Sequence, residues 1–190
     1  TDASFLAFFK AWVDDPMRHL PRSMRDHWMG EYVTRFRNVV PDDPYRYALY
    51  RIMGRFDVTK KFPTPLVLST ENWLWLQLCL ISETPAGDSH APALQSYTLQ
   101  DLANKLENYG EAHFDPKGHR PLHYFQLLLL VGRFENAVAF LCSRPAYQVD
   151  AVHFAIALTY YGLLRVSSAA QAPSLDLISV SNHVSYIDLA

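Results

Sequence analysis

The sequence QLLLLVGRFENAVAFLC, residues 126–142, is the most informative stretch of this chain. It contains two apolar segments separated by Gly132-Arg133-Phe134, and the small residues Ala137 and Ala139 open the second segment. Small side chains let one helix approach another closely. The pattern therefore predicts an αα-hairpin, in which two antiparallel helices lean on each other across a short turn.

The first helix of this hairpin is apolar almost all round, and so is a later one at about Val149 to Leu164. A helix without a polar face has to be covered on both sides, and stacked hairpins provide such cover. We therefore expect both helices to be packed between neighbouring helices. We expect His153, the one histidine of the later helix, to be hydrogen-bonded in the interior. The apolar residues of the first helix are Leu122, Phe125, Leu127, Leu128, Leu129, Leu130 and Val131.

Helical spacing also dominates the rest of the chain. Asp43-Pro44 is a helix start, since aspartate can cap free backbone N–H groups and proline has none to leave unpaired. We expect a helix from Pro44 to Met53 that Gly54 ends, and Gly54-Arg55-Phe56 repeats the Gly132-Arg133-Phe134 pattern, which predicts two turns built alike. The other predicted helices cover residues 5–13, 24–39, about 70–81 and 98–110, the last ending at Gly110.

These elements predict an all-α fold, since about seven helices are expected and no useful alternating stretch is present. An irregular α-solenoid segment of stacked antiparallel helix hairpins is favoured over a closed bundle, and the lack of a clean repeat at ~34 residues argues against a regular tetratricopeptide array. We expect residues 1–165 to form the solenoid segment, with a mobile loop at about 83–97. Residues 166–190 are expected to be a connection and the start of a further element.

Composition excludes several classes of function. The 190 residues carry a net charge of −2, and acidic residues lie among the arginines of the first third, which disfavours direct nucleic-acid binding. No apolar run approaches the ~20 residues of a membrane span, so no transmembrane segment and no secretory leader are expected. Cys79 and Cys142 lie in apolar runs, which indicates a reducing compartment. The chain begins without methionine, and we expect it to be a fragment.

Candidate chemistry is sparse. His119 and His123 could share a helix face, with His113 and Asp115 upstream, and this spacing allows a metal-dependent hydrolase as one hypothesis. Gly118 and Pro121 indicate an irregular start of the helix at this point, and no cysteine lies nearby, so both observations argue against a metal site. We predict no catalytic residue, no metal and no cofactor, and we interpret Glu107, Glu111 and Asp115 as a solvated acidic edge.

Five blocks of sequence, in the same order, resemble the nucleoporin interacting component family, which contains the ninety-three- and ninety-six-kilodalton inner-ring scaffold nucleoporins. The resemblance covers roughly Arg25 to Leu164. The blocks are DPYRYALYRIMGRFDVT (43–59), TENWLWLQL (70–78), LENYGEAHF (106–114), HYFQLLLLVGRFENAVAFL (123–141) and AVHFAIAL (151–158).

The resemblance implies a structural, non-enzymatic protein of the nuclear pore complex in the nuclear envelope, which supports pore assembly and the transport of protein and mRNA. It implies that the solenoid binds a short segment of a membrane-associated nucleoporin. Contacts with channel nucleoporins and large scaffold nucleoporins belong, in this family, to an N-terminal region that this chain lacks. The alternative that stays open is a soluble, tetratricopeptide-like adaptor that binds peptides.

The residues that match the family are structural ones, and no partner-binding residue is assigned. Gly54 and Gly132 are at the turn positions, and Trp73 and Trp75 lie in the helix after the first connection, on different faces. Phe125, Phe134 and Phe140 lie in the best-matched hairpin. We expect partners to bind in a groove between helices through a few apolar anchors.

Overall fold

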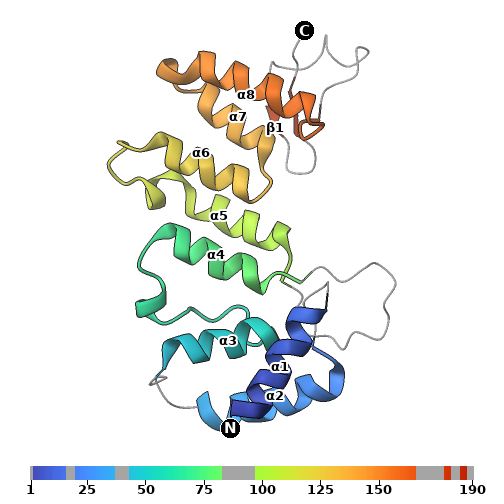
Figure 1. Ribbon diagram of the computed structural model, residues 1–190. Coiled ribbons are helices and arrows are strands. Elements are labelled where there is room, and N and C mark those ends of the chain that lie inside the picture. Colours follow the sequence, from blue (N-terminus) through green and yellow to red (C-terminus); the bar gives the residue numbers. More distant parts are fainter. Residues whose placement is uncertain are drawn as a thin grey trace. The chain divides into compact units, whose positions relative to one another are not determined.

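The computed structural model describes residues 2–15, 20–36, 43–82, 97–165, 178–180 and 185–187 (Figure 1). The chain divides into two compact units, Thr1–Thr98 and Leu99–Ala190. The predicted single segment over residues 1–165 stays a prediction. No helix in the described ranges is both long and apolar enough to cross a bilayer.

The described residues of the first unit form four α-helices and a short 3₁₀ helix. These are α1 (Asp2–Asp14), α2 (Arg22–Phe36), α3 (Pro44–Gly54), η1 (Thr64–Leu66) and α4 (Thr70–Leu80). The start of α3 is as predicted, because the Asp43 carboxylate accepts the N–H groups of Tyr45 and Arg46, each at 3.0 Å. The Ser69 hydroxyl accepts the N–H of Asn72 and caps α4 in the same way.

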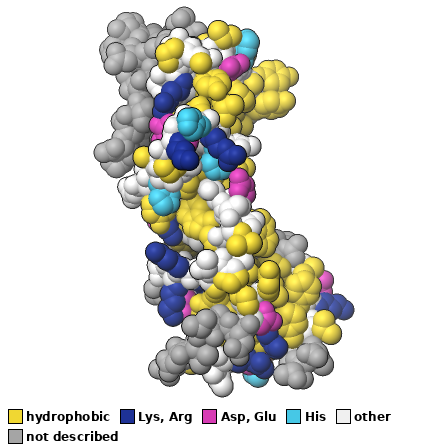
Figure 2. Space-filling model, turned by 90° about the vertical axis from the view of Figure 1, so that its left-hand side faces the viewer, with side chains coloured by type: hydrophobic (Ala, Val, Ile, Leu, Met, Phe, Trp, Pro, Cys, Tyr) yellow, Lys and Arg dark blue, Asp and Glu magenta, His cyan; other side chains and the backbone are white. Residues whose placement is uncertain are grey.

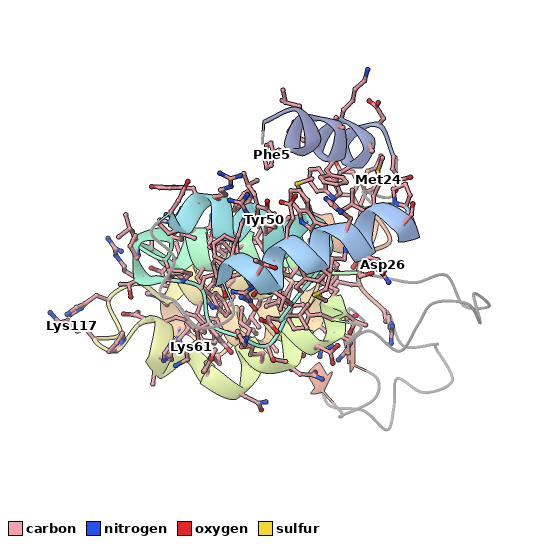
Figure 3. The ribbon with its side chains drawn as sticks, turned by 90° about the horizontal axis from the view of Figure 1, so that it is seen from below. Phe5, Met24, Asp26, Tyr50, Lys61 and Lys117 are labelled. Carbon is pink, nitrogen blue, oxygen red and sulfur yellow. The ribbon has the colours of Figure 1, made fainter. Side chains whose placement is uncertain are left out.

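Aromatic side chains make up most of one buried cluster in this unit. Trp28 of α2 is fully buried and stacks on Tyr50 of α3, with ring centroids 4.0 Å apart, while its indole N–H donates to the Tyr50 carbonyl at 3.1 Å. Figure 3 shows Tyr50 facing α2 from the neighbouring helix. This pairing holds α2 against α3. The buried cluster comprises Phe8, Leu20, Trp28, Tyr32, Tyr47, Tyr50, Met53 and Phe56.

The second unit continues the helical pattern with α5 (Leu99–Phe114), α6 (Pro121–Leu130), α7 (Phe134–Cys142), η2 (Pro145–Tyr147) and α8 (Gln148–Tyr160). Each helix packs on the next one in sequence, and α6 and α7 form the predicted hairpin. Two short strands, β1 (Ile178–Val180) and β2 (Ser185–Ile187), pair antiparallel with Ile178 opposite Ile187, and both contact α7. The sequence did not predict these strands.

The two Gly-Arg-Phe turns are not built alike, which corrects the sequence prediction. Gly132 is left-handed with φ 77°, but after α3 the left-handed residue is Arg55 (φ 53°), and Gly54 remains helical. In both turns an N–H reaches back five residues, from Phe56 to Arg51 O at 3.2 Å and from Arg133 to Leu128 O at 2.9 Å. The turn type is therefore shared, but its register differs by one residue.

The side chain of Phe56 explains this difference. Its ring folds back onto Gly54, and a Cβ at that position would overlap the ring. Glycine is therefore needed at position 54 for close approach, and the left-handed conformation falls on Arg55. The guanidinium of Arg55 donates to the Ser82 hydroxyl at 2.8 Å, which helps to fix the turn.

Other boundaries also differ from the prediction. Gly110 has a positive φ of 67°, but α5 resumes after this kink and ends at Phe114. Residues 83–96 of the predicted mobile loop lie outside the described residues, whereas Tyr97 is buried and its hydroxyl donates to Gln77 at 3.0 Å. Residues 166–177, in the predicted terminal connection, also lie outside them.

The prediction that α6 and α8 are covered on both sides is only partly correct. Leu127, Leu128 and Val131 are buried, but Leu122 is 47% and Leu130 57% exposed. In α8 the buried residues are Ala151 and Ala155, and apolar side chains on its outer face are exposed. Helix α6 thus packs on both α5 and α7 but leaves part of its apolar surface exposed, and α8 leaves its outer face exposed.

Candidate functional site

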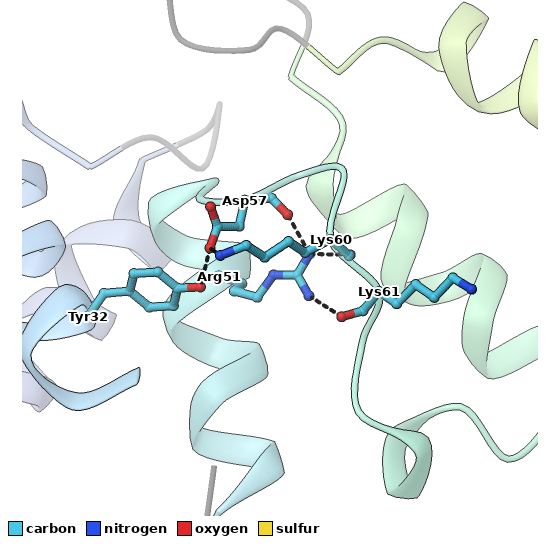
Figure 4. Close-up of polar contacts among 5 residues, drawn as sticks. All are labelled: Tyr32, Arg51, Asp57, Lys60 and Lys61. Carbon is cyan, nitrogen blue, oxygen red and sulfur yellow. Dashed lines mark hydrogen bonds and ion pairs between the residues drawn. The ribbon is translucent and has the colours of Figure 1, made fainter. Parts of the chain in front are cut away.

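A fully buried arginine organises the connection that follows α3. The guanidinium of Arg51 donates from Nη2 to the carbonyls of Asp57 and Lys60, at 2.7 and 2.8 Å, and from Nη1 to that of Lys61 at 3.2 Å (Figure 4). It lies over the ring of Phe62, 4.0 Å from the centroid. The side chain of Arg51 thus binds three backbone carbonyls of the connection between α3 and η1.

The carboxylate of Asp57 links this connection to α2. It accepts the Tyr32 hydroxyl at 2.8 Å and the Lys60 ammonium at 2.5 Å (Figure 4). Burial opposes ionisation of Asp57, but these two bonds and the nearby Arg51 outweigh it and hold its pKa below the usual value. Burial, together with hydrogen bonds to Tyr47 and Asp57, raises the pKa of Tyr32 well above its usual value, while burial lowers the pKa of Arg51. The hydrogen bonds that Tyr32, Arg51 and Lys60 donate here all go to groups of the protein itself, and they hold α2, α3 and the connection after α3 together.

Two arginines have a similar role in the second unit. Arg133, before α7, contacts Glu107 at 3.1 Å and donates to Asn104 at 2.8 Å, and Arg144, after α7, pairs with Glu111. Both glutamates belong to α5. The interpretation of Glu107, Glu111 and Asp115 as a solvated acidic edge is therefore wrong. The two glutamates bind arginines 26 and 33 residues further along the chain, and Asp115 is buried.

The predicted structural residues do not converge on one site. Phe125 is 4% exposed and its ring contacts that of Phe154 at 4.9 Å, whereas Phe134 and Phe140 are half-buried. In the first unit Trp73 is half-buried and Trp75 is 61% exposed. The importance of these residues, with Gly54 and Gly132, stays a prediction.

The histidines do not support the hydrolase hypothesis. His113 stacks on the ring of Tyr109 at 4.6 Å, and Asp115 is buried with its carboxylate accepting the N–H groups of His119 and Arg120 at 3.1 and 2.5 Å. Within the described part of the chain, no three His, Cys, Asp or Glu side chains are close enough to hold a metal ion. His153 is exposed, so the prediction of an interior histidine is wrong.

A shallow hollow lies where the α5–α6 connection enters α6. Its volume is about 340 Å³, and residues of the connection, of α6 and of η2 line it. Figure 2 shows His and Lys/Arg side chains gathered over this part of the second unit. The lining residues are His119, Arg120, Pro121, Leu122, His123, Gln126 and Tyr147.

Comparisons with known proteins agree on one family. The Nup93/Nic96 family model matches residues 1–190. The chain is 40% identical over 179 residues to nucleoporin NIC96 of Chaetomium thermophilum, covering 90% of this chain and 16% of that protein. It is 37% identical over 175 residues to the meiotically up-regulated gene 87 protein of Schizosaccharomyces pombe (92% and 20%), and 33% identical over 171 residues to nuclear pore complex protein Nup93 of Danio rerio (90% and 20%).

A solved structure gives the same result for the fold. The crystal structure of Chaetomium thermophilum Nic96 SOL matches with a TM-score of 0.81 and 36% identity, covering 98% of this chain and 26% of that one. This confirms the predicted class, an all-α irregular solenoid segment with sequentially packed helices. The chain spans about a fifth of the length of two of the relatives named above, and less of the third. By sequence and by fold, the chain belongs to the Nup93/Nic96 family.

Proposed function

We propose that this chain is a structural segment of a nuclear pore scaffold nucleoporin, located in the inner ring of the pore at the nuclear envelope. The observation that carries the proposal is the match to Nic96 SOL over 98% of the chain. The similarity to nucleoporin NIC96 and to nuclear pore complex protein Nup93 supports it. In this role the stacked helices hold other components in place and contribute no catalytic step.

The contacts of three arginine side chains support a structural role. Arg51 binds three backbone carbonyls, and Arg133 and Arg144 each tie an end of α7 to α5. Charged hydrogen bonds inside a fold are worth more than exposed ion pairs because they are less screened by water and salt. These contacts fix the connections between helices, where a stack of helices is otherwise weakest.

The partners in this proposal are other nucleoporins. A short segment of a membrane-associated nucleoporin binds the solenoid, and channel nucleoporins and large scaffold nucleoporins are bound through other parts of the protein. The exposed apolar side chains of the described helices, such as Trp75 and Leu130, are available as anchors for such segments. Binding supports pore assembly and, through it, nucleocytoplasmic transport.

Fractionation of cells tests this function. The gene product that carries this chain is tagged in its source organism, beside a version with residues 1–165 deleted. We expect the intact protein with nuclear envelopes and the deleted version largely lost from them. Recovery of the intact protein in the cytosol would instead favour the peptide-binding adaptor.

A pull-down from pore extracts tests the partner-binding part separately. The 190-residue chain is immobilised, and a variant with Phe125→Ala serves as the structurally damaged control. We expect nucleoporins to be retained by the first and reduced with the second. If the intact chain retained no nucleoporin, this segment would be a scaffold without a partner site of its own.

A further inference from the structure

The hollow beside α6 has an arginine in its lining and a lysine nearby, and neither is paired with a carboxylate of the described residues. Arg120 lines it, and Lys117 lies just before it in the same connection, where Figure 3 shows it pointing away from the helices. Neither side chain makes an ion pair with a described residue. By contrast, Arg133 and Arg144 in the same unit each bind a glutamate.

The neighbouring carboxylate is already engaged. Asp115 is 7% exposed, and both of its oxygens accept backbone N–H groups, from His119 and from Arg120. It therefore shapes the connection and leaves the Arg120 guanidinium available. His119, which also lines the hollow, is exposed and adds a further polar group.

Apolar surface lies next to these cations. Leu122 is 47% exposed and lines the hollow together with Pro121 and the half-buried Tyr147. A volume of about 340 Å³ is enough for one or two large side chains. The complementary ligand therefore combines negative charge with an apolar anchor.

A nucleic acid fits these observations less well than a peptide. Residues 99–165 carry six Lys/Arg and six Asp/Glu, and no long basic stripe runs along the described surface of α5 to α8. Nucleic-acid binding draws on many phosphate contacts, whereas only two permanent cations are present here, Arg120 in the lining of the hollow and Lys117 three residues before it.

We propose that this hollow binds a short acidic peptide segment, with Lys117 and Arg120 contacting its carboxylates and Leu122 and Tyr147 contacting one apolar side chain. The proposal rests on the proposed function in that the ligand is a segment of another protein of the assembly. The binding itself is a property of the hollow and is measured without pore material.

The test uses fluorescence anisotropy with a fluorescein-labelled peptide in which glutamates flank a central Leu-Phe pair. It compares the 190-residue chain with the double variant Lys117→Glu/Arg120→Glu. We expect the charge reversal to weaken binding about tenfold or more, because the new glutamates at positions 117 and 120 repel the glutamates of the peptide. The control Lys10→Glu, an exposed lysine of α1, should leave the affinity within about twofold.

Two further measurements make the result specific. Leu122→Ser should weaken binding of the same peptide about threefold or more through lost apolar contact. A peptide with lysine in place of glutamate should bind at least about tenfold more weakly to the unmodified chain. The mutated side chains are exposed or half-exposed, and circular dichroism verifies that each variant is folded.

Equal binding to the charge-reversed variant, or equal binding of the lysine peptide, would overturn the proposal. Tighter binding of an oligothymidylate than of the acidic peptide would assign the hollow to nucleic acid instead. If the acidic peptide did not bind but the intact protein still fractionated with nuclear envelopes, the acidic-peptide site would be refuted and the scaffold function would remain. Peptide binding combined with a cytosolic location would remove the scaffold function and leave the site.

Discussion

Replacing Arg51 by methionine should destabilise the first unit by about 3 kcal/mol. The change keeps most of the side-chain volume but removes the donors to the carbonyls of Asp57, Lys60 and Lys61. An unpaired buried acceptor costs about 1–3 kcal/mol, and we use about 1 for each carbonyl because the side chains of Lys60 and Lys61 are exposed and water can enter. Losing the contact with the Phe62 ring costs about 1 kcal/mol, and removing a buried charge offsets a similar amount.

Denaturant unfolding followed by tryptophan fluorescence is the appropriate assay. All four tryptophans lie within residues 1–98, so this signal reports on the first unit alone. Arg35→Met is the matched control, because the Arg35 guanidinium is exposed and lies 4.0 Å from Glu31, and it should change the free energy of unfolding by less than about 0.5 kcal/mol. If Arg51→Met cost no more than this control, the reasoning that Arg51 holds the connection would be refuted.

Three further predictions concern pH, the interior of the second unit and its turns. The pKa of Asp57 is lowered in the folded chain, so its contribution to stability is complete above about pH 4 and is lost as the pH falls from there through the folded-state pKa. Asp57→Asn should therefore flatten the loss of stability below about pH 4 in urea melts. Phe125→Ala should cost about 3–5 kcal/mol and the exposed Leu130→Ala less than about 1, measured by far-ultraviolet circular dichroism; similar costs would show that α6 is not oriented as described. Gly132→Ala should lower the stability by about 1 kcal/mol or more in thermal melts, because alanine is strained at φ 77°. Gly30→Ala should raise the stability by about 0.5–1 kcal/mol, because Gly30 lies in α2 and a Cβ there has open space. Changes of the same sign in both variants would contradict the assigned backbone conformations.

Features with a local cause were predictable from the sequence. The start of α3 follows from Asp43-Pro44, since the cap and the proline act within one helical turn. The α6–α7 hairpin follows in the same way from two apolar segments separated by Gly132. Family membership was also predictable, because five ordered blocks match together.

Features with a distant cause were not predictable. The left-handed residue after α3 is Arg55 because the Phe56 ring lies on Gly54, and glycine at 54 was the better candidate by local preference. The partners of Arg133 and Arg144 lie on α5, too far along the sequence for a spacing rule to find them. The exposure of α8 was missed because apolar periodicity shows that a helix has an apolar surface, but not which side another element covers.

The hollow beside α6 was visible in the sequence only as a histidine spacing. That spacing suggested a metal site. In the structure the Asp115 carboxylate instead accepts backbone N–H groups, and Arg120 has no ion pair among the described residues. Its shape depends on Tyr147, which comes from η2 and not from the histidine-containing segment. A charge count over the segment could have indicated the cations, but not their position beside exposed apolar surface.

Amide hydrogen exchange of the 190-residue chain, read by mass spectrometry, tests the central claim that each helix of the second unit is held by its neighbours in sequence. We predict strong protection at Leu127 to Val131 of α6 and at Ala137 to Leu141 of α7, and faster exchange at η2 and in the last turn of α8. Exchange of the α6 amides as fast as those of η2 would contradict the account.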